Sequence, residues 1–348
     1  MKVTFVTPPQ DEGGIGKYAD GICREMRDDA QVSRLDLPEG LGLIKHVALA
    51  WHAGTTDADV VHVQFEYAFF NPKLVFAWVF FPLLAVLTRL HGTSTAVTMH
   101  EVWESDTVDG GLEWRYVWIT HTLIAVTTDS LVFLSQNASE AFDVPVPVKR
   151  ATLPHGVDLG ETRSVDEGSA KELFGFSPDD SIIAQIGYVS PRKGTELFLK
   201  LAEKYPEHQF LIAGGPRREE DQEYFEGVRQ NAPGNVTVTG VLSDRRFHAA
   251  FVATDVAVLS YTDIRQSGIL NWCFAYCVPT ICRRIPYFER IAAEWGGILL
   301  FDDMSGAVER LSIALRESER LSAQMEEYRE SHSFERIAER HLELYLEL

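Results

Sequence analysis

Lysine is scarce in this chain of 348 residues, and the last one stands at position 204. Acidic residues number 51 against 32 lysines and arginines, which gives a formal net charge of -19. Such a surface repels nucleic-acid phosphates, so we expect no nucleic acid among the partners. An acidic, lysine-poor surface also suits a protein kept hydrated in high salt. A halophilic source and an ordinary acidic cytosolic protein fit the composition equally well.

The chain also contains few cysteines, and no signal for secretion precedes the first predicted strand. Cys23, Cys273, Cys277 and Cys282 have neither paired CxxC spacing nor a His-rich neighbourhood. This pattern argues against a disulfide framework or a zinc site, so we expect reduced core cysteines and no bound metal. The N-terminus lacks the apolar run and cleavage site of a signal peptide. We therefore expect a cytoplasmic protein.

Residues 74–87 (LVFAWVFFPLLAVL) are apolar throughout but too few to cross a membrane. A span needs roughly 20 such residues, and this run contains Pro82 and is followed by Arg89. The pattern favours a buried core helix or a pair of short helices over a face that docks on a membrane.

The length of the chain predicts two domains, because a single core rarely extends so far. Short apolar runs alternate with longer segments of helical period, which predicts two Rossmann-like, doubly wound α/β domains with parallel sheets. Ligands of such domains bind beyond the carboxyl ends of the strands. Predicted strands cover 3–6, 60–63, 95–99, 130–134 and 150–153 in the first half, and 182–186, 210–213, 236–239, 256–259, 280–282 and 298–301 in the second.

The segment Pro154 to Asp158 interrupts this alternation and marks the boundary between domains. The predicted division is therefore 1–158, 159–330 and a closing segment, 331–348. Within that segment, apolar residues at helical spacing follow Ser333, which predicts an amphipathic helix.

Two candidate segments lie in the first half. Gly13-Gly14-Ile15-Gly16-Lys17 follows the first strand and opens a helix, where glycines and free N–H groups suit a phosphate or a sugar hydroxyl. A plain tight turn explains the glycines as well. His100 and Glu101 stand at the carboxyl end of a parallel strand, although a lone His is more often structural. His62 sits similarly, and a structural role fits it better.

Two further segments lie in the second half. Arg192 and Lys193 stand in a glycine-bounded loop between a strand and a helix, and they could neutralise a diphosphate or form a solvated surface pair. Ser267 and Gly268 begin a helix after the strand at 256–259, so their N–H groups could bind an anion. Two anion sites in one domain predict one diphosphate ligand.

In order and spacing these segments resemble the family 4 glycosyltransferases of GT-B fold. The resemblance covers nearly the whole chain and depends on residues 13–19, 59–64, 98–101, 154–158, 187–194, 266–268 and 278–279. It implies two domains facing across a cleft, with the acceptor bound by the first and the nucleotide-sugar donor by the second. It also implies that the last helix crosses back to the first domain.

The resemblance further implies transfer of a hexose from a nucleotide diphosphate sugar with retention of configuration, without metal and without any other cofactor. The donor phosphates would be held by Lys193 and Arg192, and His100 would lie near the transferred sugar. The implied catalytic residues are His100, Arg192 and Lys193; the donor-binding residues are Gly14, Gly187, Gln266, Ser267, Gly268 and Asn271; the acceptor-side residues are Gly13, Lys17 and Glu101.

This sequence departs from the family pattern at three positions. Tyr188 stands where Arg is usual, and Ile264 and Trp272 replace the two glutamates that frame the donor loop. Asn271 or Asp263 could take over the contact with the ribose. Three alternatives therefore stay open: a sugar-nucleotide-binding protein without turnover, another enzyme on the same architecture such as an epimerase or phosphorylase, and an NAD-dependent dehydrogenase. The last is disfavoured because no GxGxxG is present.

The acceptor is a glycan, a lipid-linked molecule or a small-molecule hydroxyl. Apolar and aromatic residues at 65–81 permit a lipid-linked acceptor and peripheral contact at the inner membrane surface, although the acidic charge gives anionic lipid no attraction. The sequence does not indicate an oligomeric state.

Overall fold

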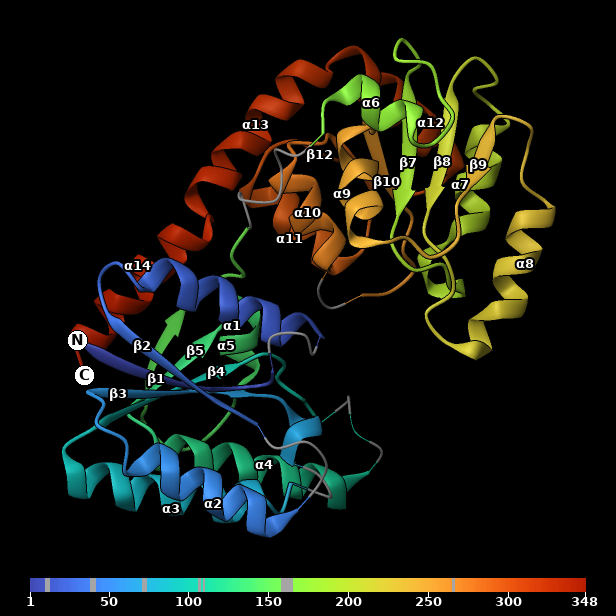
Figure 1. Ribbon diagram of the computed structural model, residues 1–348. Helices are drawn as coiled ribbons and strands as arrows, with labels where there is room; N and C mark the ends of the chain where they lie inside the picture. Colours follow the sequence, from blue (N-terminus) through green and yellow to red (C-terminus); the bar gives the residue numbers. More distant parts are fainter. Residues whose placement is uncertain are drawn as a thin grey trace. The chain divides into compact units, whose positions relative to one another are not determined.

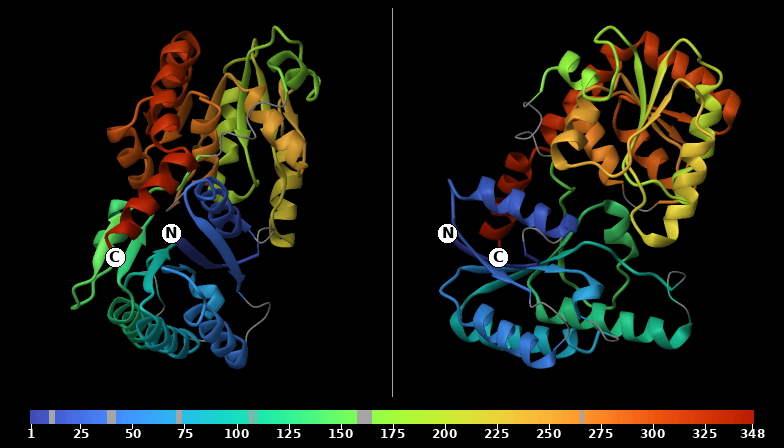
Figure 2. Two further views of the ribbon diagram at one scale, coloured as in Figure 1. Left: turned by 60° about the vertical axis from the view of Figure 1, so that its left-hand side comes forward. Right: turned by 45° about the vertical axis from the view of Figure 1, so that its right-hand side comes forward.

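The computed structural model describes residues 1–9, 13–37, 42–70, 74–105, 108, 110–157, 165–264 and 267–348. The chain forms two compact units. Unit 1 combines Met1–Gly156 with Phe334–Leu348, and unit 2 is Val157–Ser333. Unit 1 therefore carries both the blue and the red end of the chain in Figures 1 and 2.

Unit 1 contains a six-stranded parallel sheet with the order β2-β1-β3-β4-β5-β6. Its strands are β1 (Lys2–Thr7), β2 (Gln31–Asp36), β3 (Val60–Phe65), β4 (Ser94–Met99), β5 (Ser130–Phe133) and β6 (Lys149–Thr152). The central strands are buried, polar residues included, because helices cover both faces of the sheet. β2 lies at the edge, and its alternating polar sequence, QVSRLD, gives no buried-strand signal; the sequence analysis missed it.

The helices of unit 1 lie in two layers (Figure 1). α2 (Leu43–Gly54), α3 (Ala77–His91) and α4 (Gly111–Thr127) cover one face of the sheet, and α3 packs against both of its neighbours. α1 (Gly13–Met26) and α14 (Phe334–Leu346) cover the other face and pack on each other. Two short helices, η1 (Tyr67–Phe70) and α5 (Gln136–Ala141), complete the unit.

The apolar run at 74–87 forms most of a single helix, α3, with Pro82 inside it. Phe80, Phe81 and Leu84 are buried in the core, as predicted, but Val86 is 56% exposed. The prediction of a buried core helix therefore holds for one face of α3 and is wrong for the other. In the described part of the chain, no helix is long and apolar enough to span a bilayer.

Unit 2 repeats the architecture with the order β12-β11-β10-β7-β8-β9. The strands are β7 (Ile182–Ile186), β8 (Gln209–Ala213), β9 (Val236–Val238), β10 (Val256–Leu259), β11 (Thr280–Arg283) and β12 (Ile298–Phe301). The helices are α6 (Glu167–Glu172), η3 (Pro191–Lys193), α7 (Thr195–Ala202), η4 (Glu219–Asp221), α8 (Gln222–Gln230), α9 (Asp244–Val252), α10 (Gly268–Ala275), α11 (Pro286–Glu294), α12 (Met304–Arg316) and α13 (Ser318–Ser331).

Each sheet has a point where the strand order reverses, between β1 and β3 in unit 1 and between β7 and β10 in unit 2. The connections leave this point in opposite directions, so the loops at the carboxyl ends part and leave a crevice for ligands. The candidate residues at positions 14, 187, 192 and 193 all follow one of these four strands.

The chain leaves unit 1 after Gly156 and returns at Phe334. The Phe334 ring fills the space that a side chain at Gly156 or Gly21 would need. α14 buries Ile337, Ala338 and other apolar residues against β1 and α1, which explains the amphipathic pattern after Ser333. The predicted boundary fell after Asp158, a residue outside the described ranges.

Candidate functional site

Lys193 stands at the strand-order reversal of unit 2, in the short helix η3 after β7. Its ammonium nitrogen lies 3.7 Å from the centroid of the Tyr261 ring, which follows β10. Lys193 is half-buried, whereas Arg192 beside it is exposed. The ring therefore holds one cation over the crevice while the second extends into solvent.

The loop that carries Lys193 is fixed to the end of β10 by hydrogen bonds. The Ser260 hydroxyl lies 2.9 Å from the carbonyl oxygens of both Lys193 and Gly194, and the Thr262 N–H donates to the Arg192 carbonyl at 3.0 Å. Gly194 has φ +63°, and a Cβ there would collide with the Ser260 carbonyl oxygen. Only glycine fits this position without displacing the loop.

Burial, and next the nearby Arg192 guanidinium, lower the pKa of Lys193 to about 8. The folded protein therefore disfavours the ammonium form when nothing compensates for its charge. A bound diphosphate supplies that compensation through charge-assisted hydrogen bonds. An anion beside Lys193 would therefore favour the ammonium form.

Helix α10 begins beside the same loop. The Ser267 hydroxyl accepts the N–H of Leu270 at 3.1 Å, so its role is to cap the helix. Gly268 is exposed in the first turn, where helix N–H groups lack intrahelical acceptors. A Cβ on Gly187, which has φ +104°, would lie 2.9 Å from the Ile269 side chain. Gly187 therefore allows α10 to approach the end of β7.

The remaining residues of this segment contribute less. Gln266 lies outside the described residues. Asn271 is half-buried in the second turn of α10. Trp272 packs on α9, with its ring 4.9 Å from the His248 ring. Ile264 packs against the core of unit 2. The two positions where the resembled family has glutamates are thus apolar contacts in this protein.

His100 follows β4 in unit 1 and is held by Gln64 and Tyr18. Its Nε2 lies 2.7 Å from Gln64 Oε1, and its ring meets the edge of the Tyr18 ring at 5.2 Å. Because Nε2–H donates to the amide oxygen, Nδ1 is left as a hydrogen-bond acceptor. Burial, and then the nearby His155 ring, lower the pKa of His100 to about 3. His100 is therefore neutral at physiological pH.

His62 has a structural role. Its Nε2 lies 2.7 Å from Thr98 Oγ1, its Nδ1 bonds the Tyr345 hydroxyl, and its ring stacks on Phe5. The side chain is fully buried under α14. The structural interpretation of His62 is thus the one that its contacts support.

Two carboxylates lie near the ends of β3 and β4. Glu101 accepts a hydrogen bond from the Trp103 indole at 3.1 Å. Burial, and then the charge of Glu101, raise the pKa of Glu66 to about 7. The sequence analysis missed Glu66 because its burial depends on tertiary packing. Its place shortly after the predicted strand at 60–63 was the one available signal.

The glycines and the lysine at the start of α1 complete the group in unit 1. Gly14 is exposed, and a Cβ there would meet nothing within 4 Å. Packing therefore does not require glycine at this position, and the space beside it is open. Lys17 is exposed one turn later, and Gly13 is the first residue of the helix.

The predicted residues thus form two groups. Arg192, Lys193, Gly187, Ser267 and Gly268 cluster in unit 2, with Asn271 one turn away. His100 and Glu101 lie at the carboxyl edge in unit 1, and Tyr18 connects α1, which carries Gly13, Gly14 and Lys17, to His100. The structure adds Tyr261 and Glu66 to these groups; the sequence analysis had singled out neither.

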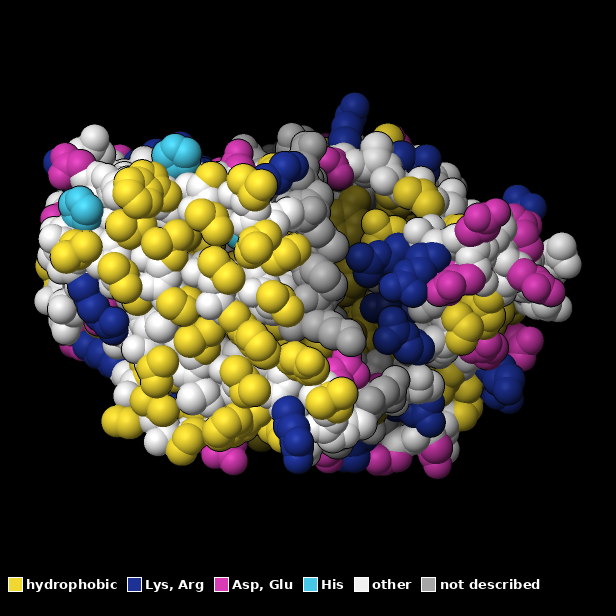
Figure 3. Space-filling model, turned by 90° about the horizontal axis from the view of Figure 1, so that it is seen from below, with side chains coloured by type: hydrophobic (Ala, Val, Ile, Leu, Met, Phe, Trp, Pro, Cys, Tyr) yellow, Lys and Arg dark blue, Asp and Glu magenta, His cyan; other side chains and the backbone are white. Residues whose placement is uncertain are grey.

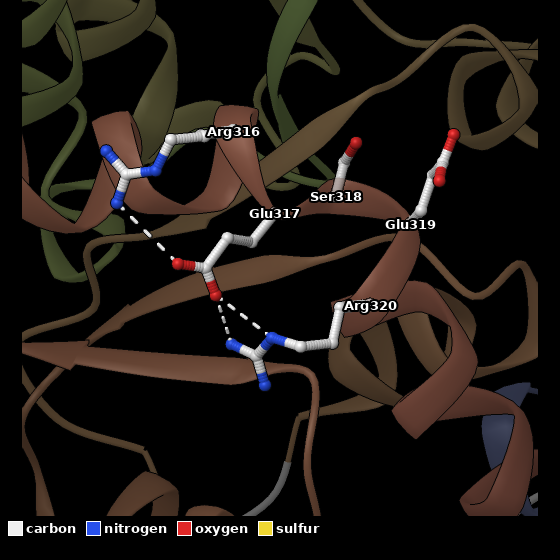
Figure 4. A pocket seen from close by; sticks show the side chains of 5 residues that line it. All are labelled: Arg316, Glu317, Ser318, Glu319 and Arg320. Carbon is white, nitrogen blue, oxygen red and sulfur yellow. Dashed lines mark hydrogen bonds and ion pairs between the residues drawn. The ribbon is translucent and has the colours of Figure 1, made fainter.

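A separate hollow lies where α12 meets α13 (Figure 4). Glu317 accepts a hydrogen bond from Arg320 Nε at 2.9 Å, and Arg316 Nη2 lies 3.6 Å away. These charges neutralise one another on the surface. The hollow is distant in sequence from the loops at the strand ends and carries no candidate chemistry. Among the described residues, no group of three His, Cys, Asp or Glu could hold a metal ion.

No family model matches the chain. Over 102 residues it is 30% identical to the alpha-galactosylglucosyldiacylglycerol synthase of Streptococcus pneumoniae (strain ATCC BAA-255 / R6), a match covering 28% of this chain and 27% of that protein. Over 61 residues it is 34% identical to a D-inositol 3-phosphate glycosyltransferase of Mycobacterium sp. (strain JLS), covering 18% and 14%. Less than a third of either relative is matched.

Solved structures match over the full length. HepE of Anabaena in complex with UDP superposes with a TM-score of 0.75 at 12% identity, covering 100% of both chains. Sucrose-phosphate synthase of Thermosynechococcus elongatus gives 0.71 at 16% identity, covering 100% of this chain and 98% of that one. These neighbours have the GT-B fold of glycosyltransferases, and so does this chain. The predicted fold class is confirmed, and the matched relatives are glycosyltransferases, as the resemblance implied.

Proposed function

We propose that this protein is a glycosyltransferase that moves a hexose from a nucleotide diphosphate sugar to an acceptor hydroxyl, with retention of configuration and without a metal ion. The observation that carries the proposal is Lys193, a half-buried cation fixed at the strand-order reversal of unit 2 beside the start of α10. The names of similar proteins agree with it: the HepE structure holds UDP, and the curated relatives transfer sugars.

In this mechanism the donor's C1–O bond to the diphosphate breaks first. Lys193, Arg192 and the N–H groups at the start of α10 stabilise the negative charge on the leaving phosphate. The sugar gains oxocarbenium character, and the acceptor oxygen bonds to C1 on the face that the diphosphate leaves. The acceptor's proton passes to a phosphate oxygen, so charge and atoms balance without an enzyme nucleophile.

In unit 1 we assign to His100 the binding of the transferred sugar. Its Nδ1 accepts a hydrogen bond from a sugar hydroxyl, because Nε2–H is engaged by Gln64. A neutral ring suits this role, since an imidazolium would oppose the developing positive charge on the sugar. We assign Gly14 to binding of the donor, and Gly13, Lys17 and Glu101 to the acceptor side.

The acceptor is a glycan, a lipid-linked molecule or a small-molecule hydroxyl. We place the reaction in the cytoplasm, which agrees with the four free cysteines, three of them buried. Metal independence follows from the proposal that Lys193 and Arg192 neutralise the phosphates. It predicts unchanged turnover in the presence of a chelator.

Sugar-nucleotide binding without turnover is the second candidate. It is favoured by Ile264 and Trp272, which pack apolar side chains where the resembled enzymes carry glutamates. In that case the donor would bind at Lys193 but no acceptor would be glycosylated.

Calorimetric titration in low and high salt tests the donor site. UDP, GDP, UDP-glucose, UDP-N-acetylglucosamine, GDP-mannose and NAD are compared on wild type, Lys193→Ala and the control Lys200→Ala, an exposed lysine on α7. We expect one nucleotide sugar to bind and Lys193→Ala to weaken it by at least tenfold, since a charge-assisted bond contributes about 1.5–3 kcal/mol. Binding of NAD alone, or an unaffected Lys193→Ala, would refute the site.

Incubating the preferred donor with an acceptor panel then separates the two candidate functions. A glycosylated product whose anomeric configuration matches that of the donor supports the transferase. Release of nucleotide with the acceptor unchanged points to another enzyme on this architecture. Donor binding without consumption over the whole panel supports the binding protein.

A further inference from the structure

The outer surface of α2, α3 and α4 displays an unusual number of exposed apolar side chains. Figure 3 looks onto this side of the molecule and shows hydrophobic side chains spread across it. We call this surface the helical face and define it by its exposed apolar residues. They are Leu43 (44%), Ile44 (85%), Val47 (36%), Trp51 (55%), Val75 (41%), Val86 (56%), Leu90 (76%), Leu112 (66%), Trp118 (38%), Ile119 (43%) and Val126 (45%).

These residues follow helical periodicity on each helix. On α2, Ile44, Val47 and Trp51 are spaced three and four apart. On α4, Leu112, Ile119 and Val126 are spaced seven apart. Such spacings put side chains on one face of a helix, so each helix presents a continuous stripe. Because α3 packs between α2 and α4, the stripes of α2 and α4 flank the exposed residues of α3 in one surface.

The charge of the helical face differs from that of the whole protein. The chain has 51 acidic and 32 basic residues. In contrast, the three helices contain one acid, Glu113, and three cations, Lys45, Arg89 and Arg115. Lys45, Glu113 and Arg89 lie in the first or last turns of their helices and Arg115 in the second turn of α4, which leaves the remaining turns without Asp, Glu, Lys or Arg. Glu113 is thus the single carboxylate on these three helices, in a chain of 51 acidic residues, so burial of this face in an apolar environment would desolvate few charges.

The hydroxyl groups of these helices are already satisfied internally. Thr122 donates to the Trp118 carbonyl at 2.8 Å, Thr120 to the Tyr116 carbonyl at 2.8 Å, and Thr88 to the Leu84 carbonyl at 3.0 Å. Burying the middle of the face therefore leaves no threonine hydroxyl orphaned. Thr88 and Thr120 are buried, so of these three only the half-buried Thr122 could meet a protein partner, and its hydroxyl has no proton left to donate.

Tryptophan is concentrated on the same helices. The chain has seven tryptophans, and Trp51, Trp78, Trp114 and Trp118 belong to α2, α3 and α4. Trp51 and Trp118 are exposed on the helical face. Indole rings with an apolar body and one N–H are characteristic of the boundary between lipid headgroups and acyl chains.

We propose that the helical face is an interfacial membrane-docking surface, which lies on the bilayer with Ile44, Val86 and Leu90 inserted among the acyl chains. The cations at the helix ends extend toward the lipid phosphates by snorkelling. Insertion of apolar side chains supplies most of the affinity, and the net charge of -19 makes attraction to anionic lipid a minor contribution. The proposal does not depend on the transfer reaction, because docking requires neither donor nor acceptor.

Flotation with vesicles tests the proposal on the full chain in the absence of nucleotide sugar. The vesicles are phosphatidylcholine alone and phosphatidylcholine with phosphatidylglycerol. The variants are the triple substitution Ile44→Gln, Val86→Gln and Leu90→Gln and a control, Val241→Gln with Leu346→Gln. The control residues are also apolar and 66% and 78% exposed, but they lie outside the helical face. Exposed positions are chosen so that both proteins fold.

We expect wild type and the control to float with both vesicles. The triple variant should lose at least tenfold in partitioning, because three apolar side chains no longer enter the acyl region. The tryptophan fluorescence of wild type should shift to shorter wavelength when the protein binds vesicles. Absence of wild type from the lipid fraction, or equal flotation of the triple variant, would overturn the proposal. A wild-type dimer in sedimentation velocity would also overturn the proposal if the triple substitution converts it to a monomer and the control substitutions do not. A second copy of the chain would then cover the face.

Discussion

The Lys193 ammonium nitrogen lies 3.7 Å from the centroid of the Tyr261 ring, and the two residues follow the strands β7 and β10 where the strand order of unit 2 reverses. The ring fixes the position of the lysine before any ligand arrives. At the same time, burial lowers the pKa of the amine to about 8, so the cation lacks full compensation without a ligand. Binding of a diphosphate would therefore cost little conformational entropy, because Lys193 is already in position.

Donor affinity should depend on pH above neutrality. Binding of the diphosphate favours protonated Lys193, whose pKa is about 8 in the free protein. Affinity should therefore fall as the pH rises through that value, by about fivefold over the first full unit above it and by about tenfold for each further unit. Lys193→Arg stays charged and should show a flat profile over the same range. Calorimetry at several pH values checks this, and parallel profiles for the two proteins would contradict it.

The Tyr261 ring should contribute to donor binding through its face. Tyr261→Phe keeps the aromatic face and should bind the donor as wild type does. Tyr261→Leu removes the ring and should weaken binding about three- to tenfold, in line with a cation–π energy of roughly 0.5–2 kcal/mol. Thermal melts of both variants provide the control, because Tyr261 is buried. Equal affinities for variants of equal stability would show that the ring does not position the lysine.

Gly194→Ala should destabilise unit 2 and disrupt the Lys193 loop. The position has φ +63°, and a Cβ would collide with the Ser260 carbonyl oxygen. We expect a loss of about 2–4 kcal/mol in the free energy of unfolding, measured by chemical denaturation. Gly227→Ala is the matched control, since its Cβ meets nothing within 4 Å inside α8. It should leave stability unchanged or raise it by up to about 1 kcal/mol. Similar effects of both substitutions would refute the steric argument.

Unit 1 should lose stability in mild acid before unit 2 does. Burial depresses the pKa of several histidines below the ordinary value of 6.5, so the unfolded chain takes up protons that the folded chain does not. Their contribution is present above pH 6.5 and is lost as the pH falls from 6.5 toward about 3, the folded-state pKa of His100 and His121. Glu66, with a pKa of about 7, opposes this trend. The histidines, all in unit 1, are His62, His100, His121, His155 and His341.

Hydrogen exchange measured by mass spectrometry between pH 7 and 5 checks this order of opening. Peptides of unit 1 should lose protection first, once intrinsic exchange rates are taken into account. His341→Leu should reduce the difference, because it removes a buried ring whose Nε2 has no partner in the described structure. Parallel loss of protection in both units would be inconsistent with control by these histidines.

Much of the fold could be predicted because parallel strands buried on both faces give continuous apolar runs. β10, with the sequence VAVL, stands out in this way. β2 could not be recognised, since an edge strand is stabilised by its neighbour rather than by its own composition. The pattern around Lys193 predicted a loop after a strand, but its partner Tyr261 follows another strand. That contact depends on the order of strands in the sheet, which local patterns do not encode.

The helical face is a second feature that local sequence patterns do not encode. Apolar residues at 74–87 predicted core packing, and hydrophobicity alone could not distinguish side chains facing the sheet from those facing outward. The distinction required the position of α3 between α2 and α4. Glu66 illustrates it again, because its raised pKa depends on burial and on a second carboxylate that follows another strand.

The return of the chain to unit 1 at Phe334 also bears on its synthesis. Unit 2 is one continuous segment, Val157–Ser333, and all of its strands are available once that segment has left the ribosome. Unit 1 emerges earlier, but its apolar surface on β1 and α1 stays uncovered until α14 arrives. The unit translated first should therefore be the last to reach its native state. During that interval it is the part of the nascent protein most exposed to chaperones and to aggregation.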